Sequence, residues 1–147
     1  MSSLHRVYLI TGAASGIGRA TAVHLAAPGV GLMLHTRSNR AGLDAVAAQA
    51  VAKGATVVTG LGDLADDGIA GEAVGIAGAA FGRLDALVSV AGAARRGAMM
   101  TLADGDLRRA MDDSVFAFTG LVRAALPLLK RADEPRIAEI GRASCRE

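Results

Sequence analysis

The sequence predicts an α/β protein with a doubly wound parallel sheet that is truncated after about the fifth strand. Two observations predict this class. Short runs rich in Val, Leu and Ile alternate along the chain with longer segments of helical periodicity. In addition, the glycine-rich stretch TGAASGIG at residues 11–18 joins the first apolar run to the first helical segment. Alternating strands and helices imply right-handed crossovers and a sheet covered on both faces.

The first strand, turn and helix occupy the N-terminal part of the chain. The run HRVYLIT at residues 5–11 is rich in apolar residues and stops at Gly12, as a buried parallel strand would. Residues 16–29 follow, with apolar side chains near helical spacing. The dipeptide Pro28-Gly29 is expected to end that helix.

The same pattern then repeats. The run VGLMLHT at residues 30–36 is predicted to be the second strand. Residues 39–54 are predicted to form a helix, because their apolar residues recur at helical spacing before Gly54 caps the segment. The run ATVVTGLG at residues 55–62 is the third predicted strand.

The second half of the chain carries the remaining elements. Residues 65–82 are predicted to be helical, although each internal glycine costs about 1 kcal/mol relative to alanine. The nearly all-apolar run LDALVSVAG at 84–92 is the fourth predicted strand. Two helical stretches follow at 102–113 and 114–131, and RIAEI at 136–140 is the fifth predicted strand.

The composition fits one globular domain and excludes several functions. The chain has 147 residues, of which 52% are hydrophobic and 20% charged, with a net charge of +2. Arg and Lys are scattered and are not interleaved with aromatic residues, so no nucleic-acid-binding surface is predicted. No apolar stretch reaches the roughly 18 residues that a membrane span needs, so no membrane partner is expected.

The chain start and the rarer residue types add further expectations. The sequence goes straight into a strand without a charged lead and a long apolar run, so no secretory signal is expected. A single cysteine, Cys145, excludes an internal disulfide, and we therefore expect a cytoplasmic protein. The histidines at positions 5, 24 and 35 are too scattered for a metal site, and each is expected at the surface or at a strand end.

The glycine turn is the strongest functional signal. Gly12 permits the tight turn, Gly16 lets the backbone come close to a pyrophosphate, and Gly18 allows the helix to pack on the sheet. Ser15 can add a hydroxyl donor, and the helix N-terminus presents N–H groups and a positive dipole end. Such turns also occur for packing alone, but the strand, turn and helix context favours a dinucleotide site. No Gly-Lys-Ser/Thr follows, which excludes a P-loop.

These residues resemble those of a known family. Thr11, Gly12, Gly16, Ile17 and Gly18 are similar to the cofactor motif of classical short-chain dehydrogenases/reductases. Later segments resemble the same family in order, namely GDLAD at 62–66, LVSVAG at 87–92 and TGLVRAALPLL at 119–129. The resemblance covers residues 5–138. It implies a Rossmann fold and hydride transfer between a nicotinamide cofactor and a carbonyl or alcohol carbon.

The resemblance also assigns further cofactor contacts. Asp63, followed by Leu64, matches the aspartate that contacts adenine in the family, although it could instead cap the following helix. Ala91 and Gly92 match the small residues that let the cofactor ribose approach. The Asn-Asn pair that precedes them in the family is replaced by Ser-Val in this chain.

The end of the second strand predicts the choice of cofactor. NAD-binding proteins usually place an acidic residue there, to accept hydrogen bonds from the ribose hydroxyls. This chain has HTRSN, so Arg37 and Ser38 stand where that acid would fall. An arginine can pair bidentately with a 2′-phosphate, which favours NADP and leaves NAD possible. The alternative is an exposed loop arginine without a role.

The catalytic groups of the family are largely missing. Counting back from Pro127, Ser114 falls at the position of the asparagine in the family's proton relay; a helix N-cap is the alternative role. No Tyr-x-x-x-Lys occurs, and the one tyrosine, Tyr8, lies in the first predicted strand. The family's catalytic serine would fall at Arg142. Because the acid/base pair is absent, we expect this chain alone to be inactive.

Two classes of function therefore remain. The first is a fragment of an NADP-dependent oxidoreductase whose full-length form acts on a small-molecule carbonyl or alcohol. The resemblance implies that the full-length protein is a homo-oligomer built through the helix around residues 114–131. The second is a non-catalytic nucleotide-binding or regulatory protein with the same fold. A nucleotide-sugar epimerase is disfavoured, because its glycine spacing usually differs.

The last residues, EIGRASCRE at 139–147, depart from the family pattern. Glu139 would place a charge in a central strand, which is costly without a partner. The run resembles one translated frame of a common DNA-sequencing adapter over its whole length. We therefore expect residues 1–138 to be an incomplete NAD(P)-binding domain and 139–147 to be a non-native tail. A divergent loop is the alternative.

Overall fold

The computed structural model describes residues 4–93, 97, 98 and 100–141. Within them, strands from across the chain form one parallel sheet, namely β1 (Arg6–Thr11), β2 (Val30–Thr36), β3 (Thr56–Leu61), β4 (Ala86–Ser89) and β5 (Arg136–Glu139). The order across the sheet is β3-β2-β1-β4-β5. The chain winds outward from β1 to β3 and then continues on the other side of β1. This arrangement is doubly wound and confirms the predicted fold class.

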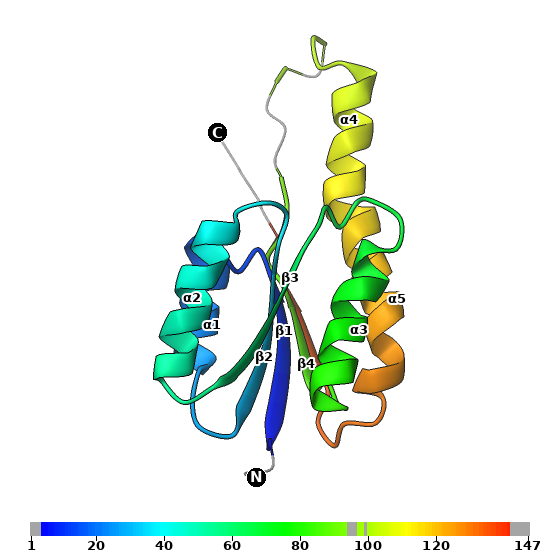
Figure 1. The fold of residues 1–147 in the computed structure, drawn as a ribbon. Helices are drawn as coiled ribbons and strands as arrows, with labels where there is room; N and C mark the ends of the chain where they lie inside the picture. Colours follow the sequence, from blue (N-terminus) through cyan, green and yellow to red (C-terminus); the bar gives the residue numbers. More distant parts are fainter. Residues whose placement is uncertain (1–3, 94–96, 99, 142–147) are drawn as a thin grey trace.

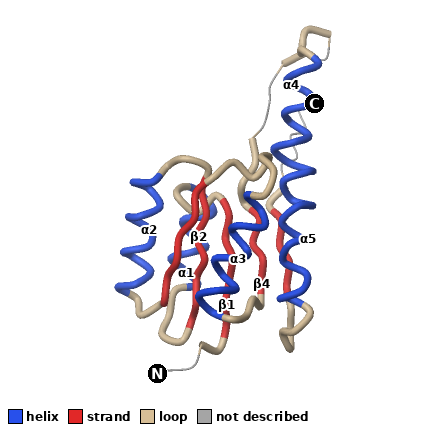
Figure 2. The backbone as a smooth tube through the Cα atoms, turned by 45° about the vertical axis from the view of Figure 1, so that its right-hand side comes forward, coloured by secondary structure: helices blue, strands red, loops and turns tan. Residues whose placement is uncertain are grey.

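Helices cover both faces of the sheet (Figure 1). Helices α1 (Gly16–Leu25) and α2 (Arg40–Ala52) lie on one face, and α3 (Ile69–Phe81) and α5 (Ala117–Leu129) lie on the other. Helix α4 (Asp104–Met111) leads into α5 and extends past the end of the sheet, as Figure 2 shows. No residue of α4 is buried. The buried apolar side chains of this segment belong to α5, which packs it against the sheet.

Two aliphatic layers join the helices to the sheet. Successive strand residues point to opposite faces. Ile10 and Leu34 belong to the layer under α1 and α2, whereas Leu9 and Met33 belong to the layer under α3 and α5. All four side chains are fully buried. Such tight packing of aliphatic side chains makes the centre of the sheet a rigid support for the loops at its ends.

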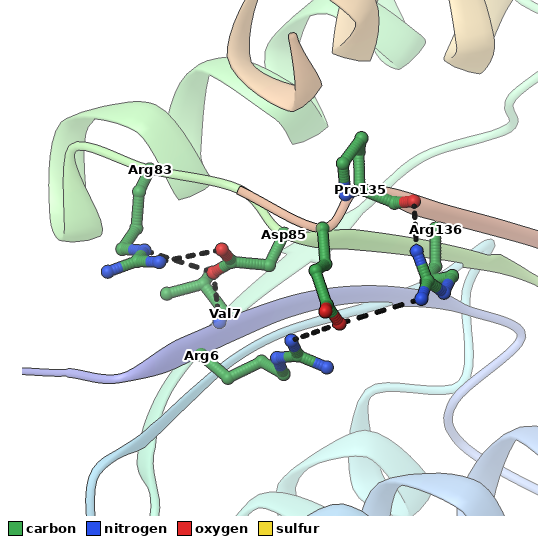
Figure 3. Close-up of polar contacts among 7 residues, drawn as sticks. Arg6, Val7, Arg83, Asp85, Pro135 and Arg136 are labelled. Carbon is green, nitrogen blue, oxygen red and sulfur yellow. Dashed lines mark hydrogen bonds and ion pairs between the residues drawn. The ribbon is translucent and has the colours of Figure 1, made fainter. Parts of the chain in front are cut away.

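The strand-start cluster lies at the N-terminal ends of the strands and consists of Arg83, Asp85 and the backbone of Val7 (Figure 3). Asp85 is 4% exposed. Its Oδ2 accepts hydrogen bonds from the Val7 N–H at 2.7 Å and from Arg83 Nε at 3.0 Å, and its Oδ1 accepts from the guanidinium at 2.7 Å. The hydrogen bond to Asp85 raises the pKa of Arg83 above its ordinary value. The cluster joins the starts of β1 and β4.

Strand β5 forms one edge of the sheet, and all four of its residues are exposed. Glu139 pairs in register with Ser89 of β4. The expectation that Glu139 is buried in a central strand is wrong for this structure, because the described residues place no helix over β5. Residues 142–147, which include the predicted catalytic-serine position Arg142 and the cysteine Cys145, lie outside the described residues.

The observed boundaries differ from the predicted ones mainly beside loops. The strand at 30–36 is confirmed to the residue. The helix predicted at 65–82 begins at Ile69, because Gly68 adopts a left-handed φ of 84° that interrupts the helix there. The two helices predicted at 102–113 and 114–131 run into each other through a π-turn at Asp112–Phe116, so no helix starts at Ser114. The helix N-cap considered for Ser114 is therefore wrong.

Candidate nucleotide-binding site

The glycine turn between β1 and α1 has the geometry that its glycines were predicted to allow. Gly12 and Gly16 have φ values of 64° and 52°, in the left-handed region that favours glycine. A Cβ at Gly12 would lie 3.0 Å from the Ala91 backbone nitrogen, and a Cβ at Gly18 would lie 2.2 Å from the Gly12 carbonyl oxygen. At Gly16 a Cβ would meet nothing within 4 Å. A side chain at Gly12 or Gly18 would therefore crowd the neighbouring backbone, whereas Gly16 faces open space.

A buried threonine fixes this turn to the neighbouring strand. Thr11 is fully buried at the end of β1. Its Oγ1 accepts hydrogen bonds from the backbone N–H groups of Val90 and Ala91, each at 3.1 Å. The segment after β4 is therefore held against the glycine turn. This contact brings two predicted cofactor segments, 11–18 and 87–92, to one end of the sheet.

The N-terminus of α1 is oriented to receive an anion. Ser15 is the N-cap in extended conformation, and its side chain makes no capping hydrogen bond. The first turn of α1 contains no acidic residue. The N–H groups of this turn and the positive end of the helix dipole therefore remain available for a phosphate. The side chain of Ile17 lies beside them and is 55% exposed.

A pocket of about 250 Å³ opens beside this turn at the carboxyl ends of the strands. It is lined by Gly12, Ser15, His35, Thr36, Arg37, Gly62, Asp63, Leu64, Ala91, Gly92, Ala93, Asp113 and Ala117. These residues come from the ends of β1 to β4 and the loops that follow them, from the π-turn and from the start of α5. The pocket thus lies at the point where the strand order reverses, which is where open α/β sheets bind their ligands.

Arg37, Asp63 and Asp113 line the pocket, and together with Arg109, which pairs with both aspartates, they form what we call the pocket cluster. Asp63 pairs with Arg37 at 3.5 Å and also accepts a hydrogen bond from Arg109. Arg109 Nε in turn lies 2.9 Å from Asp113 Oδ1. The cluster thereby links the end of β2, the loop after β3 and the α4–α5 segment, which are far apart in sequence.

The charges of this cluster keep Asp63 ionised. Burial would raise the pKa of Asp63, but a hydrogen bond from the Ala65 backbone N–H, the hydrogen bond from Arg109 and the positive charges of Arg109 and Arg37 outweigh it. The pKa therefore lies below its ordinary value of 3.8. The hydrogen bond to Asp63 raises the pKa of Arg109. Asp63 is an anionic acceptor at neutral pH.

Most of the residues predicted from the sequence gather at this pocket. Its lining includes Gly12, Ser15, Arg37, Asp63, Leu64, Ala91 and Gly92. Gly16, Ile17 and Gly18 lie at the start of α1, next to the lining turn. Ser38 is exposed just beyond Arg37. Ser114 is exposed on the π-turn and does not line the pocket, whereas its neighbour Asp113 is buried and does.

Several lining residues were not predicted. They are His35, Thr36, Gly62, Ala93, Asp113 and Ala117. Strand alternation could have flagged His35, because it shares a face with the buried Met33 two residues earlier. Asp113 could not have been found by counting, because the π-turn changes which residue of the helix faces the pocket.

The fold and this pocket define a class of protein. A doubly wound parallel sheet, a glycine turn too tight for side chains and a free helix N-terminus at the strand-order reversal are the features of a dinucleotide-binding domain. Among the described residues no helix has the length and hydropathy needed to cross a membrane.

Comparisons with known proteins narrow the class to a family. The short chain dehydrogenase family matches residues 6–146. The chain therefore belongs to the short-chain dehydrogenase/reductase family, which is a family of oxidoreductases. It is 31% identical over 143 residues to 1,6-dihydroxycyclohexa-2,4-diene-1-carboxylate dehydrogenase of Acinetobacter baylyi, covering 97% of this chain and 54% of that protein. An uncharacterized oxidoreductase of Mycobacterium tuberculosis is 33% identical over 84% of this chain and 47% of its own length.

Solved structures agree with this assignment. A short chain dehydrogenase of Burkholderia cenocepacia in complex with NADP matches with a TM-score of 0.86 and 30% identity, over 95% of this chain and 56% of that one. A mutant of a Serratia marcescens short-chain dehydrogenase/reductase matches with a TM-score of 0.88 and 29% identity, over 96% of this chain and 57% of that one. This chain spans about half the length of the relatives it matches.

Proposed function

We propose that this chain is the cofactor-binding half of an NADP-dependent oxidoreductase that interconverts a carbonyl and an alcohol. The observation that carries the proposal is Arg37 at the rim of the nucleotide pocket, at the end of β2. Its side chain is 55% exposed, so its guanidinium is accessible to a ligand. A cationic fork at this position suits a 2′-phosphate, whereas an acidic residue would repel it.

Each part of an NADP molecule would have a partner at this site. The glycine turn and the N-terminus of α1 would hold the pyrophosphate, with Ser15 as an added donor. Asp63 and Leu64 would contact the adenine. Arg37 would hold the 2′-phosphate, with Ser38 beside it. The bound nicotinamide would supply the hydride.

Ala91 and Gly92 would leave space for the ribose, as small residues in a segment that Thr11 holds against the turn.

This chain lacks the acid/base pair of the family, and this absence limits the chemistry that it can perform. Hydride transfer to a carbonyl needs a proton donor, and the 147 residues include no Tyr-x-x-x-Lys. Tyr8 lies inside β1 and is not among the residues that line the pocket. Ser114 at the family's asparagine position would at most hold a proton relay. We therefore propose that the 147-residue chain binds nucleotide and turns over no substrate; NADPH oxidation by this chain with a carbonyl substrate would contradict this.

The preference for NADP can be tested at Arg37. In the full-length protein, Arg37→Asp should weaken NADPH binding by about a hundredfold, because it replaces a partner of the phosphate by a repelling charge, equivalent to about 2.7 kcal/mol. NADH binding should change little. Isothermal titration calorimetry measures both affinities, and Arg40→Asp, an exposed substitution at the start of α2, is the matched control. Equal losses for NADPH and NADH would refute the preference.

A second candidate function is a non-catalytic nucleotide-binding or regulatory protein. The substitution of Ser89 and Val90 for the family's Asn-Asn pair favours it, together with Ser114 at the asparagine position. A kinetic assay of the full-length protein with NADPH and a panel of carbonyl compounds separates the two. Binding of NADPH without turnover of any compound would favour the second candidate.

We also propose that the full-length protein is a homo-oligomer built through the α4–α5 segment. Apolar side chains on this segment are exposed, namely Leu107 (49%), Met111 (44%), Val115 (43%), Phe116 (60%) and Leu126 (37%). Such a row of exposed apolar side chains on one long helix is typical of an interface. Sedimentation of the full-length protein tests this, with Phe116→Lys expected to shift it toward monomers.

A further inference from the structure

Arg109 of α4 and Arg37 at the end of β2 approach the same oxygen of Asp63, and only Arg109 binds it closely. Arg109 Nη2 donates a hydrogen bond to Asp63 Oδ2. Arg37 Nη1 lies 3.5 Å from that oxygen, which is longer than a usual hydrogen bond between nitrogen and oxygen. The other oxygen, Oδ1, accepts a hydrogen bond from the Ala65 N–H at 3.0 Å. Arg37 is therefore attracted to Asp63 as an ion pair without a hydrogen bond.

A second aspartate orients Arg109. Its Nε lies 2.9 Å from Oδ1 of Asp113, and Asp113 is buried. No residue of α4 is buried, so Arg109 reaches the loop after β3 from a helix outside the core. Two different nitrogens of one planar guanidinium thus contact two carboxylates, which fixes the orientation of the group. The contact of Arg109 with Asp63 is therefore pre-organised.

The two arginines also differ in their access to a ligand. The side chain of Arg37 is 55% exposed and lines the pocket, whereas that of Arg109 is 35% exposed and is not among the lining residues. Asp63 is ionised at neutral pH, because its pKa lies below its ordinary value. An ionised carboxylate beside a phosphate site competes with the phosphate for a nearby guanidinium. Arg109 supplies a countercharge to Asp63 from outside the pocket, and the guanidinium of Arg37 stays accessible.

We propose that Arg109 is a positioning residue that occupies Asp63 and thereby leaves Arg37 available for the 2′-phosphate of NADP. This inference rests on the proposed function, because it needs Arg37 to bind that phosphate. Without Arg109, Asp63 Oδ2 would draw the Arg37 guanidinium within hydrogen-bond distance. Arg37 would then have to give up a charge-assisted hydrogen bond before it could bind the phosphate. NADH has no 2′-phosphate and requires no such exchange.

The ratio of NADPH affinity to NADH affinity in the full-length protein tests the proposal. Arg109→Met should lower this ratio by about fivefold, the scale of one partly exposed ion pair. Isothermal titration calorimetry measures both affinities. Arg109→Lys keeps the positive charge and should recover most of the ratio. Arg108→Met is the matched control, because it removes the same charge from the neighbouring, exposed position of α4, and it should leave the ratio unchanged.

A double variant separates this role from a purely structural one. Adding Asp63→Asn to Arg109→Met removes the carboxylate that would compete for Arg37, so the ratio should return toward its wild-type value. A general loosening of the pocket would instead lower both affinities together, and Asp63→Asn would not restore the ratio. A double variant whose ratio stays as low as that of Arg109→Met would therefore overturn the proposal.

A measurement on the unmodified protein does not depend on the variants folding. The guanidinium ¹⁵Nε signal of Arg37 should differ between the NADPH and NADH complexes, whereas that of Arg109 should be the same in both. An Arg109 signal that also differs would overturn the proposal, because Arg109 would then contact the phosphate itself. An unchanged ratio in Arg109→Met would overturn it with NADP binding intact. If the wild-type protein does not prefer NADPH to NADH, the proposed function itself fails.

Discussion

The two ends of the sheet carry similar arginine–aspartate clusters that serve different purposes. In the strand-start cluster, both carboxylate oxygens of Asp85 are occupied by Arg83 and the Val7 N–H. In the pocket cluster, Asp63 is held by two arginines beside an open pocket. The direction of the parallel strands explains the difference, because the reversal of strand order opens a crevice outside the carboxyl ends of the strands. The same pair of residue types thus holds strands together at one end of the sheet and lines an open pocket at the other.

The largest effect is expected at the strand-start cluster. Asp85→Ala should lower the free energy of unfolding by about 3 kcal/mol, because it leaves a buried Val7 N–H and the Arg83 guanidinium without their partner. Urea unfolding of the full-length protein measures this. Asp44→Ala, which removes an exposed ion pair with Arg40 on α2, is the control and should cost less than about 0.5 kcal/mol. Similar costs for the two variants would show that the buried cluster does not join β1 to β4.

An intermediate effect is expected at the glycine turn beside the pocket. Gly18→Ala should destabilise the protein by about 2 kcal/mol, because its Cβ would collide with the Gly12 carbonyl oxygen. Gly71→Ala in α3 is the matched control: a Cβ there meets nothing within 4 Å, so alanine should stabilise the helix by up to about 1 kcal/mol. Urea unfolding measures both, and a stabilising Gly18→Ala would contradict the close approach of α1 to the turn.

The smallest effect on stability, with the clearest pH signature, is expected at Asp63. Asp63→Asn should cost about 1 kcal/mol near neutral pH, because it removes the charge that pairs with Arg37 and Arg109. The folded-state pKa of Asp63 is lowered, so its contribution is present above the ordinary pKa of 3.8 and is lost as the pH falls through the lower folded value. Unfolding free energies measured down this range should converge for wild type and variant. A difference that persists in acid would show that the arginine charges do not stabilise the fold through Asp63.

Sequence patterns were sufficient for the architecture because each strand is a short buried run with its own periodicity. The strand at 30–36 and the glycine turn depend on local rules and were predicted correctly. The contact of Arg109 with Asp63 depends on the packing of a distant helix against the loop after β3, which no local pattern encodes. The site contacts that depend on packing between distant elements could therefore not be predicted from the sequence.

The π-turn at Asp112–Phe116 has a consequence for how this pocket can change during evolution. A π-turn is equivalent to a single inserted residue that the helix has absorbed. Deleting one residue there would rotate α4 by about 100° relative to α5, and Arg109 would lose its alignment with Asp63. An insertion or deletion at this turn would thus exchange a whole set of rim side chains in one step. Length variation at the α4–α5 junction is therefore a route by which related proteins can diversify their nucleotide pockets without altering the sheet.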